Sequence, residues 1–446
     1  MTHRLDPLVS MQMRSVVFPW PPKLMIIFLV ASATMLAATL LLHVPLMLWD
    51  HIDLVPMYEA WRQGDLKSSE FWRIHDGSHF HSAAYAVLLL TTWLSGGRPW
   101  LDCVVSWVVF AAMAWALIAL ARMGWRDQHP GRFWWGALLL LVFHPGHLAN
   151  LQWGWQVAVF ISLFGAVMPI YLASRARVTH PGNFTGVLMA SMGVLGFTTT
   201  LAVFPVVVAL LVARTDEPVA RRASLVMPWV VAAAVLACWL TMARNAAFAA
   251  PGLDVLLLYV LNYLGSGVLR LASSLAPWWA AMALAVALPT AWKTRRDVRA
   301  RPWLALMAFA VGCALLTAIG RAGPFGAEHA FVIRYVSFAI LFWIGWLGLM
   351  VLAWQGSGKT WSHAIRPLLV LTAVFALANG IHMTKKAVVV RERAVSFAAL
   401  IRQQYPNVDA AVMSQAYEGR AAVAQPRLGQ LRERRFAPFV QEEGTD

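Results

Sequence analysis

The sequence predicts an all-α, polytopic transmembrane bundle of about 10–12 membrane helices, with a small extracytoplasmic helical tail at the C-terminus. Of the 446 residues, 60% are hydrophobic and 13% are charged, whereas a soluble domain carries about 25% charged residues. Apolar runs such as residues 24–42 and 338–353 are close to the length that crosses the hydrocarbon layer. Backbone groups in lipid must satisfy one another, and the runs do not alternate as barrel strands do, so these runs are predicted to be helices.

The basic residues carry the information about orientation. The formal net charge is +15, and the arginines gather in short clusters between apolar runs, a pattern that marks cytoplasmic loops. We therefore expect a lipid bilayer as a partner and no nucleic acid. The three cysteines lie inside apolar runs, at spacings that fit neither a zinc motif nor a disulfide framework.

Taken in order, the first segments set the predicted topology. Residues 1–22 are basic and should be cytoplasmic. The transmembrane domain spans residues 23–383 and begins with a retained helix at 24–42 that extends to about Leu48, since its apolar run exceeds that of a signal peptide. The polar residues 50–82 then form the first outer loop. Later basic segments should face the cytoplasm: residues 122–132, 175–180, 214–222 and 293–301.

Two further segments are not expected to cross the membrane. Residues 83–95 form a short apolar run, and if it spanned, the basic loop at 122–132 would lie outside. We expect it to be tucked at the outer surface or to enter only partly, with a full span as the alternative. Residues 255–271 contain Asn262 and Arg270 among apolar residues, which predicts an amphipathic helix at the outer interface.

The end of the chain changes character. A last membrane helix is predicted at residues 367–383, and it delivers residues 384–446 to the extracytoplasmic side as a tail. In the tail, Phe397, Leu400, Ile401 and Tyr405 follow helical spacing, which favours a small folded cap.

The first outer loop holds the candidate catalytic residues. Asp50 and Asp53 lie just beyond the first helix, where the head group of a membrane-bound substrate would be. A carboxylate there can act as a general base on a hydroxyl or hold a divalent cation against a phosphate. His75, Asp76 and His79 are candidate substrate-binding residues. With His81 they could also form a metal site, although a polar loop can carry histidines for no such reason.

Two later outer segments add candidate binding residues. Residues 143–156 supply amides and tryptophans, which together grip sugars through apolar faces and hydrogen bonds; tryptophans at this depth also fit an interfacial belt. Residues 320–335 supply arginines, which bind phosphate through their fork or snorkel to lipid head groups. The candidates are Asn150, Gln152, Trp153, Gln156, Arg321 and Arg334.

These segments, in this order, resemble bacterial members of the C-type membrane glycosyltransferase (GT-C) superfamily. The resemblance rests on residues 49–53, His75-Asp76-Gly77 with His79, residues 150–156, Arg334-Tyr335 and the tail end around residues 431–439. It implies a multi-pass enzyme of the bacterial inner membrane that uses a polyprenyl-phosphate-linked sugar donor. It also implies an acidic catalytic base in the first outer loop.

The resemblance thus implies transfer of a sugar to an envelope lipid, glycan or protein on the outer face of the membrane. Asp53, or Asp50, would be the base, and Arg334 with Arg321 would neutralise the departing phosphate. Members often carry a second acidic residue in the next outer loop, where this chain has Asn150 and Gln152, which leaves a divalent cation as an open candidate. The alternatives are a transporter or flippase of lipid-linked glycan, and a polysaccharide polymerase, ligase or acyltransferase.

Overall fold

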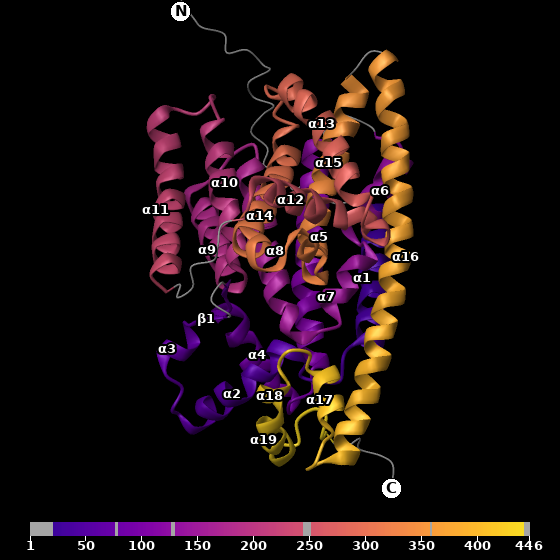
Figure 1. The fold of residues 1–446 in the computed structure, drawn as a ribbon. Helices are drawn as coiled ribbons and strands as arrows, with labels where there is room; N and C mark the ends of the chain where they lie inside the picture. Colours follow the sequence, from indigo (N-terminus) through magenta and orange to yellow (C-terminus); the bar gives the residue numbers. More distant parts are fainter. Residues whose placement is uncertain (1–20, 76–78, 126–129, 244–250, 357–358, 441–446) are drawn as a thin grey trace, which may run out of the picture.

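The computed structural model describes residues 21–75, 79–125, 130–243, 251–356 and 359–440, and their regular structure is almost entirely helical. The described strands are β1 (Ile74–His75) and β2 (His79–Phe80), which pair antiparallel with His75 opposite His79. Figure 1 shows the helices gathered into one bundle, with a smaller group of short helices at the end opposite the N-terminus. We call that end the cap end.

Among the described residues, eight helical segments are long and apolar enough to cross a membrane. This confirms a polytopic helical membrane protein. The sequence predicted more membrane helices, about 10–12. The number is smaller because the other helices in the described part of the bundle are shorter or less apolar. The eight contain α1 (Pro22–Leu42), α5 (Trp100–Gly124), α8 (Val157–Ser174), α11 (Val219–Ala243), α12 (Leu253–Leu269), α14 (Arg301–Phe325), α15 (Val336–Gly356) and α16 (Lys359–Gln404). The others in the bundle are α4 (Ser82–Ser95), α6 (Arg132–Val142), α9 (His180–Gly196), α10 (Val203–Val212) and α13 (Ala276–Thr294).

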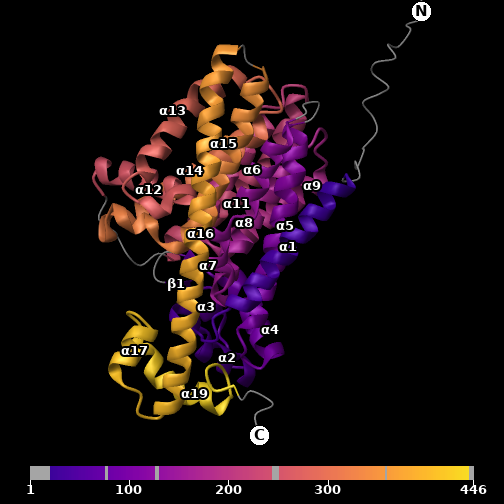
Figure 2. The same ribbon diagram turned by 90° about the vertical axis from the view of Figure 1, so that its right-hand side faces the viewer.

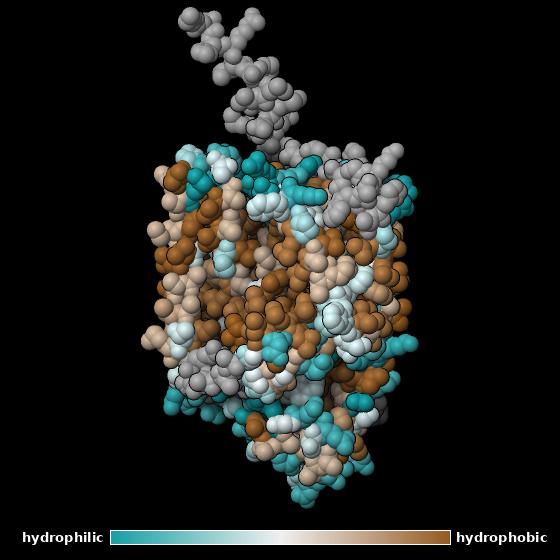
Figure 3. Space-filling view, turned by 45° about the horizontal axis from the view of Figure 1, so that its top comes forward, coloured by the Kyte–Doolittle hydropathy of each residue, from teal (hydrophilic) through white to brown (hydrophobic). Residues whose placement is uncertain are grey.

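Helix α15 forms the centre of the bundle, and the apolar part of its segment is completely enclosed by protein. Close packing there depends on small residues, as is usual between membrane helices. A side chain at Gly348 would overlap the indole of Trp303 from α14. The Gly348 carbonyl in turn accepts a hydrogen bond from the Trp125 indole at 3.3 Å. Helices α1 and α11, by contrast, are mostly exposed on the rim, and Figure 3 shows a broad apolar band between polar ends.

The first helix is shorter than the sequence predicted. Helix α1 ends at Leu42 rather than near Leu48. Pro45 lacks the N–H that a continuing helix needs, and the Val44 N–H instead donates to the Gln152 carbonyl at 2.8 Å. Residues 43–48 therefore bring the first loop back against the second outer segment.

Helix α12 is not an amphipathic helix lying free at an interface. Its polar and small residues face other helices: Asn262 donates to the Ala327 carbonyl at 3.2 Å, and a side chain at Gly265 would overlap Ala276. These residues mimic a polar face in the sequence but serve helix packing.

Helix α4 has 14 residues and is among the apolar helices too short for the length criterion. It starts beside the Gly196 end of α9, where Phe80 and His81 bond to Thr198 and Gly196. It ends beside the C-terminal residues, where the Ala437 N–H donates to the Gly97 carbonyl at 3.2 Å. These contacts join the two ends of α4 to the end of α9 and to the C-terminal cap.

The largest departure from expectation is α16. A membrane helix at 367–383 and a separate tail helix were predicted, but residues 359–404 form one helix of 46 residues. Figures 1 and 2 show it running along one side of the molecule to the cap end. The chain then folds into α17 (Ala410–Ala416), α18 (Ala421–Ala424) and α19 (Leu428–Glu433). We call residues 405–440 the C-terminal cap.

The C-terminal cap packs on the first loop through a hydrophobic cluster separate from the main core. Phe436 lies over Tyr58 of α2 (Leu54–Gln63) with ring centroids 5.2 Å apart. It also covers Gly97, whose positive φ of 76° and lack of a side chain allow this approach. The tail is therefore an ordered part of the protein, anchored beside the predicted catalytic loop.

Candidate functional site

Asp50 and Asp53 sit in the 3-10 helix η2 (Trp49–Asp53) that follows the end of α1. Side chains three residues apart in a 3-10 helix lie nearly in line, so both carboxylates project to the same side. They are 9% and 6% exposed, which is unusual for carboxylates. Burial at such a position requires compensating partners.

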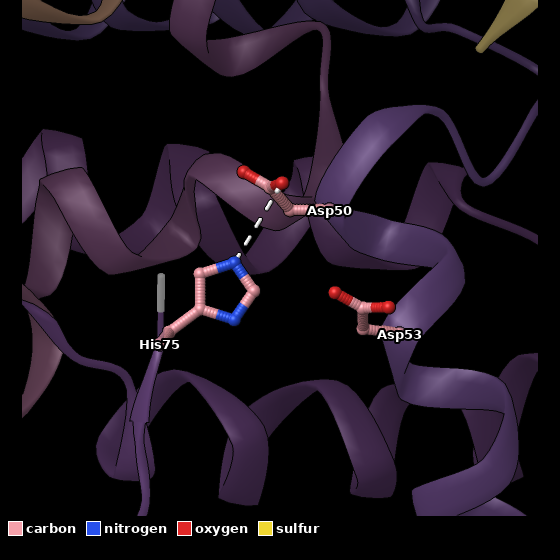
Figure 4. A group of neighbouring side chains, drawn as sticks. All are labelled: Asp50, Asp53 and His75. Atoms are coloured by element: carbon pink, nitrogen blue, oxygen red, sulfur yellow. Dashed lines mark ion pairs between the residues drawn. The ribbon is translucent and has the colours of Figure 1, made fainter. Parts of the chain in front are cut away.

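His75 approaches the two carboxylates from strand β1 (Figure 4). Its Nε2 lies 3.6 Å from Oδ1 of Asp50, and its Nδ1 is hydrogen-bonded to the Tyr85 hydroxyl at 3.2 Å. Ligand atoms of Asp50, Asp53 and His75 lie within 4.8 Å of one another, a grouping that could hold a metal ion. The structure therefore brings together three of the residues that the sequence singled out.

Asp50 is strongly acidic despite its burial. Burial alone would raise its pKa, but the hydrogen bond and charge of His75 and the charges of Arg334 and Arg420 lower it to about 2. Asp50 is consequently ionised at neutral pH. The charge of Arg334 thus reaches the first outer loop from the third outer segment.

Arg420 and Arg427 of the C-terminal cap complete the site, and neither was anticipated from the sequence. Arg420 pairs with Asp53 and places its Nη1 3.3 Å from Oδ1 of Asp50. Arg427 binds Oδ1 of Asp53 at 2.6 Å and the Ile52 carbonyl at 2.9 Å. Positions 53 and 420 are 367 residues apart, so no local pattern could have paired them.

The second outer segment packs against the first loop and against the start of α15. The Asn150 amide donates to the Ser337 hydroxyl at 2.8 Å and to the Arg334 carbonyl at 3.3 Å, which holds the start of α15. Trp153 meets Trp49 edge to face at 4.9 Å. The backbone carbonyl of Gln152 accepts the hydrogen bond from the Val44 N–H noted above, and the side chains of Gln152 and Gln156 are buried.

His79 and His81 line the site as uncharged aromatic groups. His79 stacks on Phe197 at 4.2 Å, and burial, with the nearby charges of Arg321 and others, lowers its pKa well below the usual value. Burial also lowers the pKa of His81 to about 3. Among the described residues the metal-like grouping joins His75 to the two aspartates and not to these histidines. Asp76 lies outside the described residues.

The Arg321 guanidinium lies 5.6 Å from the centre of the Phe325 ring. Burial, and then the charges of Arg321 and Arg334, lower the pKa of His329 to about 4. Both arginines therefore act on the histidines, and Arg334 also acts on Asp50.

A second buried pair lies behind the aspartates. His51 Nε2 is 3.6 Å from Oδ2 of Asp102 at the start of α5, and the Thr91 hydroxyl donates to the other oxygen of Asp102. A side chain at Gly154 would collide with Asp102. Sequence reasoning missed Asp102 because a single acidic residue at a helix start ordinarily signals only a favourable dipole.

No family model matches this chain, and no curated protein or solved structure matches it. The functional assignment therefore rests on the chemistry of the residues described above.

Proposed function

We propose that the protein is an inverting membrane glycosyltransferase that takes a sugar from a polyprenyl-phosphate carrier and transfers it to an envelope acceptor. The observation that carries this proposal is a pair of buried carboxylates that form ion pairs with arginines, at one end of a bundle of apolar helices. Such a site offers a base for a hydroxyl and cations for a phosphate, next to the layer in which a lipid carrier lies.

In the proposed reaction, an acceptor hydroxyl gives its proton to a carboxylate as its oxygen forms a bond to the anomeric carbon. The bond from that carbon to the phosphate oxygen breaks, and the electron pair leaves with the polyprenyl phosphate. Arg334 neutralises the charge that develops on the phosphate.

The ion pairs favour Asp50 over Asp53 as the base, which reverses the preference drawn from the sequence. Both oxygens of Asp53 are bound by Arg420 and Arg427. Asp50 shares only its Oδ1 in the contacts given above. Asp53 is then an ion-pair partner of the two cap arginines and not the base.

A divalent cation fits this site poorly while the C-terminal cap is docked. Three of the four carboxylate oxygens already face guanidinium groups, which would repel a cation bound between them. We therefore expect sugar transfer to continue in EDTA. A loss of activity that Mg²⁺ or Mn²⁺ restores would show that the arginines give way to a metal.

The proposed location is the bacterial inner membrane, with the cap end outside and the N-terminus in the cytoplasm. The loop between α13 and α14, whose sequence is rich in arginine, lies at the end opposite the cap (Figure 1), and clustered positive charge favours the cytoplasmic side. In a chain without its native cysteines, Glu418→Cys should react with a membrane-impermeant thiol reagent in intact cells, whereas Lys293→Cys should not. The reverse labelling would invert the topology.

Mass spectrometry of envelope glycans tests the function itself. Cells lacking the protein should lose one sugar from a lipid, glycan or protein, and the wild-type gene should restore it while an Asp50→Asn gene should not. Glycans that lack a whole repeat or chain, rather than one sugar, would favour a polymerase, ligase or transporter. Unchanged glycans would contradict the proposal.

A further inference from the structure

The C-terminal cap is held in place by more than its charges. The Phe436 contacts with Tyr58 and Gly97 are apolar, and Arg434 forms a separate ion pair with Glu59, at 2.6 Å and 2.7 Å. The cap can therefore stay docked while the arginines nearest the aspartates change partners.

The charges around the aspartates are not balanced. Arg334, Arg420 and Arg427 act on Asp50 and Asp53, so among the described residues of this cluster three arginines face two carboxylates. A partly buried cluster with an excess of guanidinium groups attracts an anion. Phosphate oxygens match the fork of an arginine as well as carboxylates do.

The two cap arginines are held differently. Arg427 binds the Ile52 carbonyl as well as Asp53, which fixes it to the backbone of the first loop. Arg420 instead spans two carboxylates, with Nη1 toward Asp50 and Nη2 on Asp53. Its side chain is 21% exposed, so an incoming ligand can reach it.

We propose that Arg420 is a phosphate-binding residue of the site, which exchanges the two aspartates for the phosphate of an isoprenyl-phosphate lipid when that lipid binds. This inference rests on the proposed function and assigns its donor site to the C-terminal cap.

Binding of farnesyl phosphate to the purified full-length protein in detergent tests this assignment, with farnesol as the uncharged comparison. Losing charge-assisted hydrogen bonds of this kind weakens binding roughly 10- to 100-fold, and we expect Arg420→Gln to do so. Arg434→Gln, a change in the same cap at an ion pair away from Asp50 and Asp53, should leave the affinity within about twofold of wild type. Farnesol should bind all three proteins equally. Equal losses in both variants, or none in Arg420→Gln, would overturn the assignment.

A variant with the opposite expected sign separates partner exchange from a merely structural ion pair. Asp53→Asn removes a competitor for Arg420, so it should bind farnesyl phosphate more tightly than wild type. Weaker binding by Asp53→Asn would mean that the carboxylate positions the arginine and does not compete, which contradicts exchange.

The source of the phosphate and the reaction are tested separately. If dioleoyl phosphatidic acid competes with farnesyl phosphate at equal affinity, the isoprenyl part of the assignment is wrong. Arg420-dependent binding without any change in envelope glycans on deletion would remove the proposed reaction but keep the binding site. Sugar transfer that persists in Arg420→Gln, with unchanged binding, would remove the binding site but keep the reaction.

Discussion

The centre of the bundle and the site at the cap end are both buried, yet they are held together by different forces. Around α15, glycines let tryptophan side chains approach the backbone, as Gly348 does for Trp303. At the cap end, Asp50 and Asp53 are buried among arginines and histidines. The bundle is held together by close packing of apolar side chains, whereas the site is held together by ion pairs between buried charges. Substitutions in the two regions should therefore differ in kind: loss of stability in one and loss of chemistry in the other.

The largest expected effect is the loss of the base. Asp50→Asn keeps the size of the side chain but removes its ability to accept a proton, so sugar transfer should fall roughly 10²- to 10⁴-fold while the protein still inserts and folds. Turnover of the purified variant, compared with its melting temperature, measures both. Asp53→Asn should lose less. The reverse order would return the role of base to Asp53.

Acidification should weaken the folded protein through its buried histidines. Burial lowers the pKa of His51 and of His81 to about 3, so the unfolded chain takes up their protons first as the pH falls below about 6.5. Stability is then full above that pH and falls by about 1.4 kcal/mol per pH unit for each histidine down to about pH 3. Melting curves between pH 7.5 and 5 should show this slope.

The matching control for that slope is an exposed histidine. His180→Gln at the start of α9 should leave the pH dependence unchanged, since the side chain is exposed. His81→Asn should reduce the slope of stability against pH. An unchanged slope would mean that His81 takes up no proton when the protein unfolds in this pH range.

A smaller effect is expected from filling space in the bundle. Gly348→Ala puts a methyl group into the Trp303 ring, and overpacking of this kind costs about 1–3 kcal/mol. The melting temperature should fall, while turnover per folded molecule stays at the wild-type level. Gly136→Ala in α6, where a methyl group meets no atom within 4 Å, is the control. Lost turnover in folded Gly348→Ala would couple the bundle to the site.

The smallest effect should come from Arg334→Lys, which keeps the charge and loses the fork. We expect about a tenfold loss of sugar transfer, the size of one charged hydrogen bond, with little change in stability. A kinetic assay at saturating donor measures it. Wild-type turnover would leave Arg334 with a role at lipid head groups alone.

The sequence allowed the bundle to be predicted better than the site. Apolar runs identify helices because each helix satisfies its own backbone, so the run at 338–353 lies within a few residues of the limits of α15. Polar residues misled where they serve packing, as Asn262 does in α12. The predicted end at residue 383 was wrong because a helix can continue past the end of an apolar run, as α16 does. The partnership of Arg420 with Asp53 has no sequence signature, because folding alone brings the two segments together.

Helix α16 is continuous from the bundle into the C-terminal cap, and its 46 residues amount to about 69 Å at 1.5 Å each. Its length sets the distance between the bundle and the C-terminal cap, and its turn per residue sets the direction in which the cap faces around the axis of α16. Inserting one residue after Lys386 would lift the cap by only about 1.5 Å but turn it by about 100°, away from Asp50 and Asp53. The number of residues in α16 therefore helps to set where Arg420 lies relative to the two aspartates.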